Sequence, residues 1–184
     1  DHITNTAFHI QIFEALNYKV PTFAHHTFLT DSEGKGFGKR LGSLSIKKIK
    51  NDGYENITII NYLLSIGTST NLTKDILVDN IIKNFNIKTL SSSSPKFSIN
   101  VLKELNKDIL QKYNFSDVKN KFMEMGIENL NENFWVFVKY NIDFFYECLE
   151  WRNIIFSDLP NPTDDPDFLK QALLLLPDEP FNIG

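Results

Sequence analysis

The sequence predicts a mainly α-helical fold with more than one domain. Apolar residues recur three and four positions apart in several stretches, which is the spacing of one helix face. Of the 184 residues, 42% are hydrophobic and 13% aromatic, enough for a sizeable core or for up to two small domains. This composition excludes an intrinsically disordered chain.

The first predicted helix covers residues 5–17, where apolar side chains from Phe8 to Leu16 share one face. Thr4 or Asn5 is the expected N-cap, because their side-chain oxygens accept hydrogen bonds from the first backbone N–H groups of a helix. The helix is expected to end before the Val-Pro pair at 20–21, since the residue before a proline avoids helical backbone angles.

A glycine-rich loop and a basic segment follow this helix. Residues 31–38 hold three glycines within five positions, which predicts a mobile loop, and residues 35–50 contain six basic side chains and no acidic one. Such a loop can close over a triphosphate, where the Lys39 ammonium would stabilise negative charge on a leaving pyrophosphate. It is not a Walker A loop, because Gly-x-x-x-x-Gly-Lys-Ser/Thr is absent. A solvated surface turn remains the alternative interpretation.

The remainder of the chain is predicted to be helical. Two helices are expected between residues 46 and 66, separated by a turn at 51–53 and stopped by Gly67. The serine run at 91–94 before Pro95 is the clearest linker signal, although it is too short for a free tether. Three further stretches carry helical patterns, of which the last is long and densely aromatic: 99–113, 116–125 and 133–156.

Several features favour structural roles over chemistry. Adjacent side chains diverge, so His25 and His26 are not predicted to bind a metal, and no structural metal is expected. The single Cys148 cannot form an internal disulfide, which favours a reducing compartment and a buried thiol. The aromatic side chains between 134 and 151 are expected in the core rather than on a base-stacking platform. No apolar stretch approaches the roughly 20 residues that span a bilayer, so a soluble chain is expected. Its expected location is the cytoplasm.

Four blocks within the first 45 residues carry a family pattern. They are Asp-His-Ile-Thr-Asn-Thr-Ala at 1–7, Gln-Ile-Phe-Glu-Ala-Leu at 11–16, Pro-Thr-Phe-Ala-His at 21–25 and Gly-Phe-Gly-Lys-Arg-Leu-Gly-Ser-Leu-Ser at 36–45. In order and spacing these blocks resemble the bacterial class I glutamyl-tRNA synthetases. The Ser-Pro-Lys-Phe at 94–97 extends the resemblance toward the second half. The His-x-Gly-His signature of that family is absent, so the chain resembles a C-terminal fragment and is expected to be inactive alone.

The resemblance implies a three-part organisation. Residues 1–44 would be the end of a Rossmann-type class I catalytic domain, 45–112 a helical stem-contact domain, and 113–184 the start of an α-helical anticodon-binding domain. The implied reaction is the ATP-dependent attachment of glutamate to tRNA through glutamyl-adenylate, for protein synthesis.

The resemblance also implies roles for individual residues. Asp1 and His2 would border the adenosine, and Lys39 would be the catalytic lysine that holds the phosphates, with Arg40 beside it. The loop departs from the family's Lys-Leu-Ser-Lys-Arg pattern, since its first lysine and serine are missing and Lys35 lies one position away. The predicted tRNA contacts are Lys47, Lys48 and Lys50.

The implied substrates are L-glutamate, tRNA(Glu) and ATP with Mg²⁺, and the implied oligomeric state is a monomer. Whether tRNA(Gln) is charged as well is left open by the sequence. Two alternatives also stay open. One is a truncated paralogue that glutamylates a tRNA base, although such a protein would lack the helical second half. The other is a non-catalytic helical interaction module.

Overall fold

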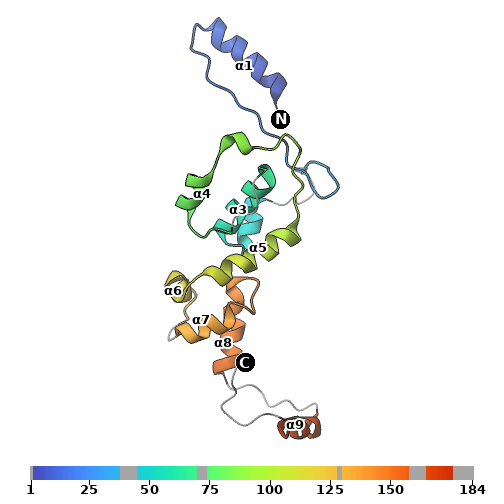
Figure 1. Ribbon diagram of the computed structural model, residues 1–184, viewed down its shortest axis with the longest axis vertical. Helices are drawn as coiled ribbons and strands as arrows, with labels where there is room; N and C mark the ends of the chain where they lie inside the picture. Colours follow the sequence, from blue (N-terminus) through green and yellow to red (C-terminus); the bar gives the residue numbers. More distant parts are fainter. Residues whose placement is uncertain (1, 38–44, 70–73, 128–129, 158–164, 176–184) are drawn as a thin grey trace. The chain divides into compact units, whose positions relative to one another are not determined.

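The computed structural model describes residues 2–37, 45–69, 74–127, 130–157 and 165–175, and these residues are mainly helical (Figure 1). The helices are α1 (Ile3–Ala15), α2 (Ile46–Asn51), α3 (Asn56–Gly67), α4 (Val78–Asn84), η1 (Ile87–Thr89), α5 (Ile99–Lys112), α6 (Phe115–Glu124), α7 (Glu132–Val138), η2 (Phe145–Glu147), α8 (Cys148–Phe156) and α9 (Pro166–Leu173). Within the described ranges, β-pairing is limited to isolated bridges. The predicted mainly α fold is confirmed.

The chain divides into two compact units, Asp1–Cys148 and Leu149–Gly184. The first unit extends across both predicted domain boundaries, after residues 44 and 112, and those boundaries stay predictions. In the second unit, α9 begins with Pro166 at its first position, and the Asp165 carboxylate caps it by accepting a hydrogen bond from the Phe168 backbone N–H at 2.9 Å. Among the described residues, no helix is both long and apolar enough to cross a membrane.

Helix α1 confirms the first predicted helix, but its start differs from the prediction. His2 is the N-cap, with a left-handed φ of 65°, and both Thr4 and Asn5 lie inside the helix. The predicted cap is wrong because the helix already begins at Ile3, so the Thr4 hydroxyl and the Asn5 amide lie beyond the cap position. The predicted apolar face is not buried, since Phe8 and Ile12 are 60% and 55% exposed.

The core of the first unit lies between α3 and α5, which pack against each other (Figure 1). Tyr62 on α3 and Leu102 and Ile109 on α5 are buried there, and burying each such side chain contributes about 1.5–3 kcal/mol. The Tyr62 hydroxyl also accepts a hydrogen bond from the backbone N–H of Ser98, the N-cap of α5, at 2.6 Å. This hydrogen bond joins α3 to the start of α5, in addition to the packing of their side chains.

The predicted linker at 91–95 is a short loop between η1 and α5 inside the first unit. Its end is held by backbone pairing, since the Thr30 N–H donates to the Pro95 carbonyl at 3.0 Å and the Phe97 N–H donates to the Thr30 carbonyl at 2.8 Å. Thr30 also bridges to Gly36. The segment before residue 38 is thus anchored to the start of α5.

The long aromatic stretch 133–156 is broken rather than continuous. It contains α7, η2 and α8, with the interruption at residues 139–144. At the break the Asn141 side chain donates to the Phe137 carbonyl at 2.9 Å, and the Glu147 carboxylate accepts from the Asp143 N–H at 2.8 Å. Side-chain hydrogen bonds of this kind replace the helical ladder, and apolar spacing alone does not reveal them.

Candidate functional site

A cavity lies beside the start of α1. It has a volume of about 450 Å³, within the range of small-molecule sites. Its walls come from His2 and from two stretches after α1: 24–29 and Phe37. Aromatic and imidazole rings dominate this lining, so the cavity offers stacking surfaces and polar nitrogen atoms to a flat heterocyclic ligand.

Hydrogen bonds to Thr6 hold the two histidines of this cavity close to α1. The Thr6 hydroxyl lies 3.1 Å from Nε2 of His25 and 3.3 Å from the backbone carbonyl of His2. The His2 ring lies 3.0 Å from the Asn5 amide nitrogen through its Nδ1. His2 therefore combines a strained, left-handed backbone with a fixed ring. Of the predicted adenosine-bordering pair, His2 lines the cavity, and Asp1 lies outside the described residues.

The glycine-rich segment is described only up to Phe37. Between 31 and 36 it forms a hydrogen-bonded turn rather than an unstructured loop, since the Asp31 carboxylate accepts from the Glu33 N–H at 3.0 Å and the Lys35 N–H at 2.8 Å. The Lys35 ammonium pairs with Glu33 at 2.9 Å on the surface. The predicted phosphate-binding residues Lys39 and Arg40 lie outside the described residues.

Sequence reasoning missed the aromatic side chains of the cavity. Phe28 packs over Gly36 so closely that an added Cβ would lie 2.4 Å from its ring. Glycine is therefore required there for the close approach of a ring, rather than for mobility. The ring of Phe37 meets that of Phe97 edge to face, with centroids 5.9 Å apart. The alternation of aromatic and small residues at 22–30 was the available signal.

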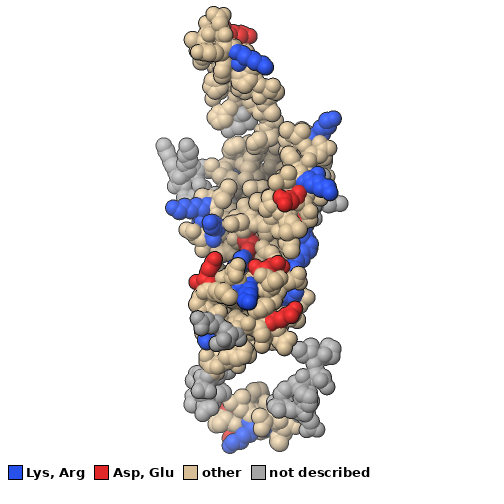
Figure 2. All heavy atoms as spheres, turned by 90° about the vertical axis from the view of Figure 1, so that its left-hand side faces the viewer, with Lys and Arg blue, Asp and Glu red and all other residues tan. Residues whose placement is uncertain are grey.

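The predicted tRNA contacts lie on α2. Its apolar Ile49 is buried in the core, which leaves Lys47, Lys48 and Lys50 exposed. The Lys48 ammonium forms an ion pair with Asp52 at 3.0 Å. The face shown in Figure 2 carries lysine and carboxylate side chains interleaved over its middle rather than one continuous basic stripe.

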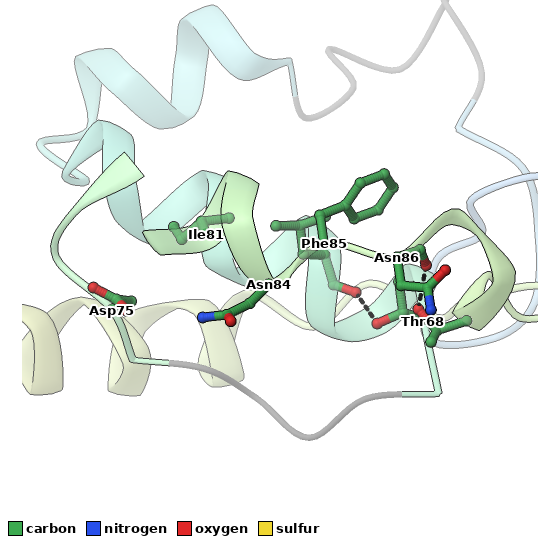
Figure 3. A pocket seen from close by; sticks show the side chains of 8 residues that line it. Thr68, Asp75, Ile81, Asn84, Phe85 and Asn86 are labelled. Carbon is green, nitrogen blue, oxygen red and sulfur yellow. Dashed lines mark hydrogen bonds between the residues drawn. The ribbon is translucent and has the colours of Figure 1, made fainter. Parts of the chain in front are cut away.

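A second cavity lies among α3, α4 and η1 and has a volume of only about 40 Å³ (Figure 3). Two of its hydroxyls are already bonded, since Thr68 donates to the Leu64 carbonyl and Thr89 to the Asn86 carbonyl, each at 2.7 Å. A space of this size holds one or two water molecules. It is too small for a nucleotide.

Ionisable groups do not form a metal centre in the described part of the chain, where no three histidine, cysteine or carboxylate side chains gather. The predicted buried thiol is confirmed, because Cys148 has no exposed surface. Burial, with a smaller contribution from the Glu147 carboxylate, raises the pKa of this thiol to about 12. Since the thiolate is the nucleophilic form, Cys148 is not a candidate nucleophile.

A comparison with protein families matches residues 1–104 to the catalytic domain of the class I tRNA synthetases for glutamate and glutamine. Glutamate–tRNA ligase 1 of Brucella canis is 36% identical over 187 aligned positions, which cover 99% of this chain and 41% of the relative. Glutamate–tRNA ligase 2 of Brucella melitensis shows the same identity and coverage. The chain thus spans about two fifths of the length of these curated relatives.

Among solved structures, a glutamate tRNA ligase from Elizabethkingia meningosepticum, crystallised with its amino acid, superposes with a TM-score of 0.70. The match covers 95% of this chain and 41% of that protein, at 19% sequence identity. The glutamate–tRNA synthetase of Elizabethkingia anophelis gives a TM-score of 0.64 over 94% of this chain. At this identity the likeness shows a shared fold.

Proposed function

We propose, from the premise that the chain belongs to the class I tRNA synthetases for glutamate and glutamine, that it is part of a glutamyl-tRNA synthetase. The reaction would be the ATP-dependent activation of glutamate followed by its transfer to tRNA. The observation that carries this proposal is the family match over residues 1–104, and the curated relatives named above are glutamate–tRNA ligases.

At the nucleotide, we assign the cavity beside α1 to the adenosine. Rings of the 24–29 stretch and His2 would stack on the base and exclude water, while Asp1 would lie at the same edge. Lys39 and Arg40 follow the anchored turn at 31–37 within a few residues, so they would reach the phosphates. When the glutamate carboxylate attacks the α-phosphorus, pyrophosphate leaves, and the Lys39 ammonium would neutralise the developing charge. Mg²⁺ would enter with ATP.

At the tRNA, we assign the lysines of α2 to backbone phosphates. Their exposure supports this role, since Lys47 and Lys50 lie on a helix whose buried side chain is Ile49. A charge on a fixed helix positions a phosphate without reading sequence. The organisation would be a catalytic end at 1–44, a stem-contact domain at 45–112 and the start of an anticodon-binding domain at 113–184. The partners would be L-glutamate and tRNA(Glu), with tRNA(Gln) as an open second substrate, in a cytoplasmic monomer.

The test is a fluorescence-anisotropy titration of the chain with tRNA(Glu) and with an unrelated tRNA, at physiological salt. Replacing Lys47 and Lys50 by alanine should weaken binding and lower the slope of log affinity against log salt by about one per lysine. Replacing Lys83 and Lys88, which are also exposed, provides the charge-matched control and should leave the affinity for tRNA(Glu) nearly unchanged.

A second titration tests the phosphate loop. The Lys39→Ala variant should bind ATP more weakly than the unsubstituted chain and should bind tRNA(Glu) with nearly unchanged affinity. If neither tRNA binds, or both bind equally, the proposed function is wrong, and a helical interaction module becomes the better interpretation.

A further inference from the structure

Helices α5 and α6 are joined by only two residues, Tyr113 and Asn114, at the predicted boundary between the stem-contact and anticodon-binding domains. Tyr113 is the C-cap of α5, with a ψ of 136°, and Asn114 is the extended N-cap of α6. A two-residue connection in extended conformation leaves four dihedral angles that can redirect α6, which is the usual composition of a hinge. Something other than the connection must therefore fix the direction of α6.

The carboxylate of Glu55 makes direct contacts across this connection, beside those of Asp143 and Phe144 with the elements before it. Glu55 immediately precedes α3, and its side chain is only 12% exposed. The carboxylate accepts a hydrogen bond from the Tyr113 hydroxyl at 3.2 Å and forms an ion pair with the Lys121 ammonium on α6. One side chain therefore bonds to the hinge residue and to the helix beyond it.

The cation is also held on its other sides. The Lys121 ammonium lies over the rings of Tyr113 and Phe145, 5.3 Å and 5.2 Å from their centroids, in the range of cation–π attraction. On the far side of the hinge, the indole N–H of the buried Trp135 donates to the Tyr113 carbonyl at 2.8 Å. Removing the Glu55 carboxylate would leave Lys121 without its charge partner in this partly buried cage, a costly arrangement.

The backbone of Glu55 completes the connection to α5. Its N–H donates to the side-chain oxygen of the buried Asn106 at 2.9 Å, and the Asn106 amide donates to the Asp143 carbonyl at 2.7 Å. Residue 55 is thus tied to α5 through its main chain and to α6 through its side chain. A second carboxylate also spans the hinge, since Asp143, which lies beyond α7, pairs with Lys103 and Lys107 of α5 at 2.8 Å and 3.9 Å. The side chain of Asp143 is 35% exposed, whereas that of Glu55 is 12% exposed and contacts α6 directly.

We propose that Glu55 is a positioning residue for tRNA, which sets the direction of α6 and α7 relative to α3 and α5 through the Tyr113–Lys121 contacts. This inference rests on the proposed function, because it requires that one tRNA meets residues on both sides of the hinge. Two contact regions on one rigid body reinforce each other through effective concentration, and that gain falls when one region moves freely. Loss of the Glu55 carboxylate should therefore weaken tRNA binding without touching a tRNA contact.

The experiment compares Glu55→Ala, Glu55→Gln and the unsubstituted chain for affinity to tRNA(Glu). Glu104→Ala is the matched charge control, since Glu104 is an exposed carboxylate on α5 and its loss changes the net charge equally. Removing a negative charge should favour RNA binding, so a weaker affinity cannot be an electrostatic artefact. Ile109→Val, in the core of α5, controls for lost stability.

A distance measurement reports on the hinge directly. Spin labels on cysteines introduced at the exposed positions Asp79 and Asn120 lie on α4 and α6, one on each side of the hinge. The native Cys148 can remain, because it is buried. The distance distribution should broaden in Glu55→Ala and should stay narrow in Glu104→Ala and Ile109→Val.

Affinity for tRNA(Glu) should fall by about ten-fold in Glu55→Ala. Glu55→Gln should restore part of it, because its amide oxygen still accepts from the Tyr113 hydroxyl. An unchanged affinity in Glu55→Ala, or a loss no larger than that of Ile109→Val, would overturn the inference. If Glu55→Ala does not fold, Glu55→Gln decides alone, by the same comparison with Ile109→Val. Failure of the unsubstituted chain to prefer tRNA(Glu) would instead overturn the proposed function, and the inference with it.

Discussion

Replacing Asn106 by leucine should be among the most damaging single changes in the first unit. The side chain is fully buried, and its oxygen accepts from the Glu55 N–H at 2.9 Å and from the Thr58 hydroxyl at 3.0 Å, while its amide donates to the Asp143 carbonyl at 2.7 Å. Leucine fills a similar volume but leaves three polar groups without this partner.

The magnitude follows from those three groups. An unsatisfied buried polar group costs about 1–3 kcal/mol. The Thr58 hydroxyl can recover part of this loss by bonding to the carbonyl of Glu55, the N-cap of α3 three residues earlier. The groups of Glu55 and Asp143 are only partly buried. We therefore expect a loss of about 3–4 kcal/mol, which is a large share of the roughly 5–15 kcal/mol of a typical domain.

The assay is urea unfolding followed by the fluorescence of Trp135, in a background where Trp151 is phenylalanine. Asn100→Leu on the exposed face of the same helix is the control and should change the free energy of unfolding by less than about 0.5 kcal/mol. A double-mutant cycle adds Thr58→Val, which should reduce the cost of Asn106→Leu. An Asn106→Leu variant within about 1 kcal/mol of the unsubstituted chain would refute the reasoning.

Two further predictions concern protonation and backbone conformation. Burial raises the pKa of the Cys148 thiol from 9.0 to about 12 and that of the Tyr113 hydroxyl above 10.0, so the folded state keeps protons that the unfolded chain loses. The free energy of unfolding should stay constant below about pH 9 and then fall by up to about 1.4 kcal/mol per pH unit for each group. A fall in the Cys148→Ala variant as steep as in the unsubstituted chain would contradict this. Gly53 and Gly34 both have positive φ, but an added Cβ at Gly53 would lie 2.6 Å from the Tyr146 ring, whereas Gly34 is open. Gly53→Ala should therefore cost about 1–3 kcal/mol more than Gly34→Ala, and equal melting temperatures would show that the ring moves aside freely.

The sequence predicts the buried faces of the helices better than it predicts where the helices end. Apolar spacing correctly predicts α5 and α6, because their buried side chains lie on one stripe. It does not predict the break after α7, which depends on hydrogen bonds made by Asn141 and Glu147 to the local backbone. Spacing reports where apolar side chains meet, whereas helix ends depend on polar atoms that have no period.

The candidate site shows the same division between chemistry and geometry. The family resemblance implies roles for Lys39 and His2 through a short motif, and these roles stay predictions. The sequence does not predict that the Phe28 ring lies over Gly36 or that the Thr6 hydroxyl lies within hydrogen-bond distance of His25. Each contact depends on how the chain folds back, and no sequence spacing is typical of it.

The contacts at the hinge between α5 and α6 are also not predictable from sequence spacing. Glu55 and Lys121 are 66 positions apart, and each alone reads as a solvated surface charge at the edge of an amphipathic helix. They meet because Asn106 already fixes the main chain of Glu55. The Glu55 carboxylate therefore reaches the hinge without a further loss of backbone entropy. The buried Asn106 amide thus helps to place the Glu55 carboxylate, which stands before another helix, α3. Under the proposed function, the affinity for a long ligand such as tRNA would then depend on a residue that does not touch it.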